Sequence, residues 1–128
     1  MIFEGNIEVN SMCCHHFMPF VGVCHIAYIP ELEGNITGLS KLNRVTEWFS
    51  RRPQIQEELT KQIHDYLFDK LKPRGLAVSI EAVHNCVKMR GVKHHNTSMV
   101  TSEFSGVFLE NDNLARSEFL TYISNLKK

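Results

Sequence analysis

The strongest strand signal in this chain begins at Leu76, where apolar residues occupy every second position as far as Ala82. Side chains of a β-strand alternate between the two faces of a sheet, so these apolar residues form one buried face. If no bulge intervenes, the same alternation places His84, Cys86 and Arg90 on that face as well. The pattern therefore predicts a strand that begins in the core and ends in side chains able to bind a metal or act on a substrate.

The other hydrophobic patterns predict two strands and then two helices before this strand, and one strand and one helix after it. The strands are expected at residues 2–12, 19–30, 76–90 and 98–109, and the helical stripes at 42–49, 55–71 and 119–126. Ser40 is a natural N-cap for the first helix, whose apolar stripe includes Trp48. Pro53 stops that helix and suits the first turn of the next.

Together these elements predict an α+β fold with the order ββααββ and a short C-terminal helix. Four strands in an antiparallel sheet, with two long helices on one side, leave the edges of the sheet unpaired. Exposed strand edges can pair with another chain, so we expect the protein to form oligomers in which neighbouring copies cover these edges.

The composition is that of an ordinary globular protein. The chain has 128 residues, of which 43% are hydrophobic and 22% charged, which suits a single domain at residues 1–128. Its 14 Lys and Arg cancel its 14 Asp and Glu, so no overall positive field indicates nucleic acid or an anionic membrane as a partner. No apolar run approaches the roughly 18–20 residues of a membrane span, and the N-terminus does not resemble a signal peptide. We therefore expect a cytoplasmic protein whose cysteines stay reduced.

Residues 11–16, Ser-Met-Cys-Cys-His-His, lie in the expected turn between the first two strands. Cys13 and His16 have the C-x-x-H spacing that lets both side chains reach one tetrahedral metal ion. With Cys86 they would offer zinc two thiolates and one imidazole and leave a fourth position open, which is typical of catalytic sites. The alternative is that Cys24 and Cys86 are small buried hydrophobes and the histidines are surface loop residues. The spacing alone does not choose between these interpretations.

Two cations, Lys41 and Arg44, occupy the first turn of the first expected helix. The helix dipole disfavours positive charge there by a few tenths to about 1 kcal/mol for each residue. A phosphate bound at the helix N-terminus would explain them, because the free N–H groups and the cations would then face the same anion. The alternative is a solvated helix end whose cations pair with Glu31, Glu33 or Glu47 in weak surface ion pairs.

Glu57 lies in the first turn of the second expected helix, where the helix dipole favours a carboxylate. It would also suit the two adjacent N–H groups on the edge of guanine, and the spacing does not decide between these roles. The basic segment at residues 88–95 lacks the interleaved aromatic residues of a nucleic-acid surface, and the chain is neutral overall. We therefore interpret it as a polar strand end, with Arg90 facing His84 and Cys86.

Taken together, these segments resemble the zinc-dependent GTP cyclohydrolase I family, and the likeness runs from about Glu8 to Ser124. It is carried, in the family's order, by SMCCHHFMPFVG, GLSKLNR, SRRPQIQEELTKQI, AVHNCVKMRGV and TSEFSGVF. The resemblance implies the tunnelling fold, in which subunits assemble into a ring, typically a decamer, with active sites at subunit interfaces. It also implies conversion of GTP and water to 7,8-dihydroneopterin triphosphate and formate, with Zn²⁺ as the cofactor.

Carried over position by position, the resemblance assigns roles to particular residues of this chain. It implies zinc ligation by Cys13, His16 and Cys86, and acid–base catalysis by His15 and His84, with His84 as the donor to N7 of guanine. It implies binding of the triphosphate by Ser40, Lys41, Arg44 and Arg90, and recognition of guanine by Gln56 and Glu57. A histidine, with an unperturbed pKa of about 6.5, suits proton transfer at neutral pH.

Two departures from the family pattern matter. Position 14 is usually Glu in the family, whereas this chain has Cys14, and a thiol does not replace a carboxylate as an acceptor for a neighbouring histidine. We therefore expect a perturbed but present zinc site. The chain also begins almost at the first expected strand, so we expect it to lack the helical N-terminal extension of many family members.

Two other functions are compatible with this fold. One is that of a non-catalytic relative that binds a nucleotide without turning it over. The other is that of the nitrile reductase of the same fold, which uses a cysteine nucleophile and NADPH and does not need the Cys-His-Cys metal set. For an active cyclohydrolase, the sequence does not indicate whether the product enters folate, other pterin or 7-deazaguanine biosynthesis.

Overall fold

The computed structural model describes residues 1–15, 17–84 and 98–127 of the chain. Its elements are β1 (Ile2–Cys13), β2 (Pro19–Ile29), α1 (Leu39–Ser50), β3 (Pro53–Gln54), α2 (Gln56–Leu71), β4 (Gly75–His84), β5 (Met99–Gly106), the 3₁₀ helix η1 (Val107–Leu109) and α4 (Leu114–Leu126). The predicted α+β class and the order of its main strands and helices are confirmed. Within these ranges no helix is both long enough and apolar enough to cross a membrane.

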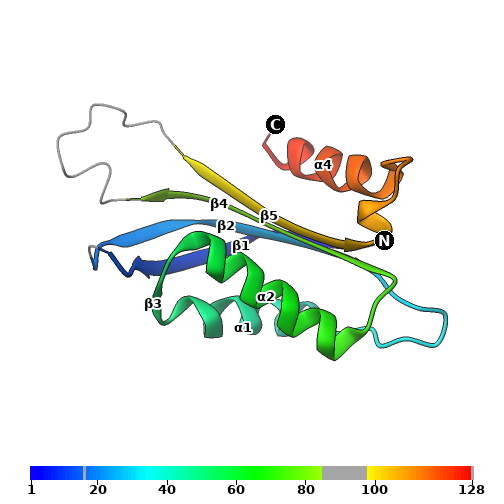
Figure 1. Ribbon diagram of the computed structural model, residues 1–128, viewed down its shortest axis with the longest axis horizontal. Helices are drawn as coiled ribbons and strands as arrows, with labels where there is room; N and C mark the ends of the chain where they lie inside the picture. Colours follow the sequence, from blue (N-terminus) through cyan, green and yellow to red (C-terminus); the bar gives the residue numbers. More distant parts are fainter. Residues whose placement is uncertain (16, 85–97, 128) are drawn as a thin grey trace.

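A five-stranded sheet in the order β3-β1-β2-β4-β5 forms the middle layer of the described structure. Its long pairs, β1–β2, β2–β4 and β4–β5, are antiparallel. Figure 1 shows α1 and α2 on one face of this sheet and α4 on the other. The main core lies between the sheet and α1 and α2, where Phe20 and Tyr28 are fully buried, and a smaller cluster around Phe108 and Phe119 lies under α4.

The fifth strand, β3, escaped prediction because it is only two residues long and so short a segment shows no alternation. It runs parallel to β1, with Met12 beside Pro53 and Cys13 beside Gln54. Pro53 has no N–H to donate, so it is tolerated at this edge of the sheet. The prediction of a wholly antiparallel four-stranded sheet is therefore corrected to five strands with one short parallel pair.

The starts of both long helices differ from the predictions. The N-cap of α1 is Gly38, so Ser40 lies inside the first turn and no side-chain hydrogen bond caps the helix. The second helix begins at Gln56, so Pro53 belongs to β3 and not to the first turn of α2. Local propensity alone would have favoured Ser40 and Pro53 at these positions. Pro53 is instead taken up by its pairing with Met12 of β1.

The buried side of α1 follows Leu42, Thr46 and Ser50, which lie one turn apart. Thr46 and Ser50 each donate a hydrogen bond to the backbone oxygen four residues earlier, at 3.0 and 2.6 Å, which allows their hydroxyls to be buried. Trp48, predicted to belong to the apolar stripe, therefore lies away from the buried side and is 65% exposed.

A bulge near the start of β1 forms a hydrogen bond with a buried histidine. Asn6, within the bulge, has a positive φ of 57°, and its backbone N–H donates to Nδ1 of His25 at 3.1 Å. His25 is 2% exposed, and its ring stacks with Phe3. Its Nε2 has no hydrogen-bond partner in the described part of the chain. A proton added to this ring would remove the acceptor of the Asn6 N–H and bury a charge.

The titration of His25 predicts a loss of stability in acid. Burial lowers the pKa of His25 from 6.5, while the Glu81 carboxylate raises it and the Lys127 ammonium lowers it further. The unfolded chain therefore takes up this proton at a higher pH than the folded chain does. The contribution of His25 to the free energy of unfolding is full above about pH 6.5 and is lost as the pH falls below that value.

Urea unfolding at a series of pH values between about 7.5 and about 5 measures this loss. Each proton taken up on unfolding contributes a slope of up to about 1.4 kcal/mol per pH unit. The slope should be smaller in the variant His25→Phe, which keeps an aromatic ring beside Phe3 but cannot titrate. An unchanged slope in that variant would contradict the role of His25.

Candidate functional site

His84 is the last residue of β4 and lies at the end of the sheet where β2 begins. Its ring stacks on Phe20, its partner in the β2–β4 pairing, with the ring centroids 4.6 Å apart. Its Nε2 lies 2.7 Å from Oε1 of Gln56, the first residue of α2. The start of β2 and the start of α2 therefore hold this imidazole from two sides.

The Gln56 side chain is fully buried, and its neighbours determine its orientation. Its Nε2 donates to the backbone oxygens of Ile80 at 3.1 Å and Met99 at 3.0 Å, and it contacts Thr101 Oγ1 at 3.1 Å. Because carbonyl oxygens only accept, the amide nitrogen must face them and Oε1 must face His84. Neutral His84 therefore carries its hydrogen on Nε2, which donates to Gln56, and Nδ1 is the nitrogen that can take and release a proton.

The surroundings of His84 influence its protonation in opposite directions. Burial lowers the pKa of His84, and the Glu57 carboxylate raises it. Glu57 follows Gln56 in the first turn of α2 and is exposed. A part-buried imidazole beside an exposed carboxylate is suited to exchange a proton with a bound molecule near neutral pH.

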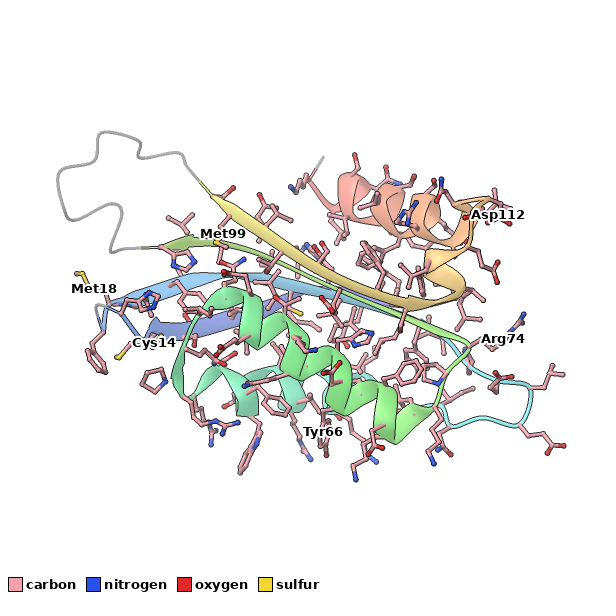
Figure 2. All side chains as sticks on the ribbon, in the orientation of Figure 1. Cys14, Met18, Tyr66, Arg74, Met99 and Asp112 are labelled. Carbon is pink, nitrogen blue, oxygen red and sulfur yellow. The ribbon has the colours of Figure 1, made fainter. Side chains whose placement is uncertain are left out.

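The turn between β1 and β2 carries the predicted cysteine and histidine cluster to this same end of the sheet, where Figure 2 labels Cys14 and Met18. The Cys13 N–H donates to Met18 O at 2.9 Å, and the Phe17 N–H donates to Cys13 O at 2.8 Å, which closes the turn. Cys13 is 7% exposed. Cys14 is half-buried, and its N–H donates to Gln54 O in β3 at 3.2 Å.

Only part of the predicted metal and catalytic set lies in the described ranges. His16, Cys86 and Arg90 fall outside them, whereas His15 is exposed in the turn after β1. Among the described residues, no group of three His, Cys, Asp or Glu side chains is placed to hold a metal ion. The donor chemistry still fits zinc, because the buried thiol of Cys13 lies at the end of the sheet where β4 stops, two residues before Cys86.

Cys24 plays no part in this site. It lies in the middle of β2 and is fully buried, and burial raises the pKa of its thiol to about 12. Such a thiol remains protonated and inaccessible, so Cys24 is the buried hydrophobe that one interpretation of the sequence predicted.

Two of the predicted phosphate-binding residues lie at a separate cavity of about 480 Å³ beside α1, the end of α2 and the loop before α1. Lys41 and Arg44 line this cavity, and no carboxylate does. Ser40 is exposed in the same turn of α1 but does not line it. Pairing of the two cations with Glu47 is not observed, because Glu47 instead pairs with Arg51 at 2.8 Å. The cavity is therefore positively charged.

Within one chain, the histidine site and the cationic cavity lie toward opposite ends of the sheet. In Figure 1, β4 ends on one side of the molecule, and the end of α2 and the loop before α1 lie on the other. In the β2–β4 pairing, Phe20 is opposite His84 at one end and Ile29 is opposite Gly75 at the other. The strand between these two pairs spans about 30 Å. The cavity lies at the second end, because Leu71, four residues before β4 begins, lines it. Within one chain, Lys41 and Lys70 of this cavity therefore lie well away from His84.

The architecture places this chain among the tunnelling-fold proteins. The archaeosine synthase QueF-Like in the apo form aligns with a TM-score of 0.65 at 13% identity, covering 82% of this chain and 92% of that one. A dihydroneopterin aldolase from Burkholderia thailendensis bound to guanine aligns with a TM-score of 0.52 at 14% identity, covering 81% and 88%. At these identities the likeness shows the fold alone, and it confirms the fold predicted from the sequence.

Within that class, a model of the family described as GTP cyclohydrolase I matches residues 1–124, so the chain belongs to that family. It is 50% identical over 125 residues to GTP cyclohydrolase 1 of Chlorobaculum tepidum, 46% over 123 to that of Methylococcus capsulatus and 52% over 108 to that of Carboxydothermus hydrogenoformans. These alignments cover 98%, 96% and 84% of this chain but 54%, 65% and 56% of the relatives. The chain thus spans between half and two thirds of their length.

The neighbours that hold His84 were not predicted from the sequence. The stack with Phe20 depends on the β2–β4 register, and the bond to Gln56 joins residues far apart in the sequence. One signal was available, because Gln56, Leu59 and Ile63 have the i, i+3, i+7 spacing of one helix face. This spacing would have indicated that Gln56 is buried with the core residues.

Proposed function

We propose that this protein converts GTP and water to 7,8-dihydroneopterin triphosphate and formate, using residues 1–128 as one domain. Membership of the family supports the reaction class. The observation that carries the proposal is the imidazole of His84, fixed by Gln56 so that Nδ1 can exchange protons at the end of the sheet where the Cys13 turn lies. The product would feed folate, other pterin or 7-deazaguanine biosynthesis in the cytoplasm.

Proton transfer is the role of the two predicted catalytic histidines. C8 of guanine is a poor electrophile, so its hydrolysis needs a proton on N7. Protonated His84 would donate that proton from Nδ1 while Nε2 remains bonded to Gln56. Glu57 raises the pKa of His84 and would accept N–H groups from guanine. His15 would move protons during ring opening and formate loss.

Gln56 acts in this proposal through His84. The family resemblance implied that Gln56 recognises guanine together with Glu57. Its side-chain hydrogen bonds instead go to His84, Ile80 and Met99, so both ends of its amide are already bonded to protein groups and are not available to guanine. We therefore assign the recognition of the guanine edge to the Glu57 carboxylate and the positioning of the acid–base group to Gln56.

Zinc is the cofactor that we propose, held by Cys13, His16 and Cys86. When bound, it supplies the Lewis acidity that activates water near neutral pH. The contribution of the described residues is to hold the Cys13 thiol, buried and anchored by the turn, at the end of β4. Cys14 offers no carboxylate acceptor, so we expect the neighbouring histidines to be less firmly oriented than in the family pattern.

A second copy of the chain completes the site in this proposal. GTP bound at His84 would place its triphosphate on Ser40, Lys41 and Arg44 of a neighbouring copy, with Arg90 as a further contact. The described sheet has free edges that suit such an assembly, because β3 covers only Met12 and Cys13 of β1 and β5 has no outer neighbour. Pairing of β1 in one copy with β5 in the next would continue the sheet around a ring, for which we propose a decamer.

Formate release from GTP tests this proposal. The zinc-loaded protein should release formate and form a pterin chromophore. Removal of zinc by a chelator should slow the reaction by at least about 100-fold, and added zinc should restore it. Folded, zinc-loaded protein that binds GTP without releasing formate would be a non-catalytic relative, and NADPH-dependent nitrile reduction would indicate the reductase. Either result would overturn the proposal.

A further inference from the structure

A third cation, Lys70, lies at the cavity that Lys41 and Arg44 line. Lys70 is in the last turn of α2, and its side chain also lines the cavity. Its Nζ is 5.7 Å from the ring centroid of Tyr66, another lining residue. Two helices therefore direct three cations toward one cavity of about 480 Å³, a volume within the usual range for small-molecule sites.

No negative charge from the described residues balances these three cations. No carboxylate lines the cavity, and none of the three takes part in an ion pair within the described ranges. By contrast, Arg51, the residue after α1, pairs with Glu47, and Lys61 in α2 pairs with Asp65. Like charges around one concave surface repel each other and raise its positive potential, so a bound polyanion would stabilise the arrangement.

The cavity rim is held in place by hydrogen bonds. Asn35 Nδ2 donates to the backbone oxygen of Lys70 at 3.4 Å, which ties the loop before α1 to the end of α2. The Thr37 N–H donates to the hydroxyl of the fully buried Tyr28 at 3.1 Å, which anchors the loop to the core. The loop beside the three cations is therefore ordered before a ligand binds, so binding does not include the entropic cost of ordering it.

The helix dipole alone does not account for this position of Lys70. A cation in the last turn of a helix interacts favourably with the dipole whichever side of the helix it occupies. Lys70 instead lies over Tyr66, on the side where the other two cations meet.

We infer that Lys70 binds the terminal phosphate of the substrate, next to Lys41 and Arg44, and thereby selects nucleoside triphosphates over diphosphates. The inference rests on the proposed function, because it takes the triphosphate of GTP to enter this cavity. A third cation adds most to the binding of the most highly charged form of the ligand, so its effect should increase with the number of phosphates.

Calorimetric titration of the assembled protein with tripolyphosphate, pyrophosphate and GTP tests this inference. Lys70→Ala should weaken the binding of tripolyphosphate and GTP by about fivefold to tenfold, and that of pyrophosphate by about twofold or less. In turnover, KM for GTP should rise by a similar factor while kcat changes little. Lys61→Ala is the matched control, since Lys61 lies on the same helix outside the cavity and should leave all three affinities unchanged.

The outcomes separate this inference from the proposed function. If Lys41→Ala weakens tripolyphosphate binding and Lys70→Ala does not, Lys70 is not part of the site and the proposed function stands. If neither substitution has an effect, the triphosphate does not enter this cavity, and both proposals fail. Equal losses for pyrophosphate and tripolyphosphate, or an equal effect of Lys61→Ala, would show a general attraction for anions and would overturn the selectivity.

Discussion

Formate release from GTP should return when two impaired variants, His84→Ala and the double variant Lys41→Ala/Arg44→Ala, are assembled together. His84→Ala removes the proposed acid and should lower the rate by about 10²- to 10⁴-fold. The double variant removes two charged contacts to the triphosphate and should lower kcat/KM by at least about 100-fold. The reason for recovery is that the two sets of residues lie toward opposite ends of one chain, and in the proposed assembly each site takes them from two neighbouring chains.

The expected recovery follows from random assembly. Each site takes its histidine half (His84) from one chain and its cationic half (Lys41 and Arg44) from the neighbouring chain. In a ring built from equal amounts of both variants, about one site in four therefore receives both halves intact. Co-expression with different affinity tags would supply mixed rings, and two-step purification would confirm that both chains are present. Formate release should then approach about a quarter of the wild-type rate.

A matched control uses two substitutions in the same half of the site. His84→Ala assembled with Gln56→Leu should show no such recovery and should stay below the rate of Gln56→Leu alone, since the His84 side of every site in such a ring is damaged. Mixed rings of His84→Ala and the double cation variant that stay as inactive as their parents would contradict the division of the site between two copies.

Gln56→Leu should lower the free energy of unfolding by about 2–4 kcal/mol. Leucine fills a similar volume, so the loss comes from hydrogen bonds more than from a cavity. The buried oxygen of Ile80 and the part-buried oxygen of Met99 would lose their shared donor, and the Nε2–H of His84 would lose its acceptor. A urea titration followed by circular dichroism measures the change.

The matched control for stability is Gln62→Leu on the same helix. The side-chain oxygen of Gln62 is buried but accepts no hydrogen bond from the described residues, so this substitution should cost less than about 1 kcal/mol. A Gln56→Leu variant as stable as Gln62→Leu would show that the hydrogen bonds of Gln56 contribute little.

Activity gives a separate measure of the positioning role. At a temperature where Gln56→Leu remains folded, formate release per folded chain should fall by at least about tenfold, because nothing then fixes the tautomer and angle of His84. Unaltered turnover per folded chain would remove Gln56 from the mechanism and leave it a purely structural role.

Local patterns predicted some features of this protein well and others poorly. The alternation from Leu76 to Ala82 predicted a buried strand face, and the structure confirms it, because the period of a strand follows from backbone geometry alone. The exposure of Trp48 was predicted wrongly, because Thr46 and Ser50 satisfy their hydroxyls within the helix and occupy the buried side instead. The strand β3 was not predicted, because a strand of two residues is too short to show the alternation of apolar and polar side chains.

By itself, the sequence determined the order of the elements, the faces turned to the core and the family to which the chain belongs. These follow from side-chain periodicity and from several motifs in a fixed order. Only the tertiary structure decided that Gln56 and Phe20 hold His84, that Lys70 joins Lys41 and Arg44, and that these groups lie toward opposite ends of the sheet. Such contacts depend on strand register and on the docking of helices against the sheet, which local periodicity does not encode.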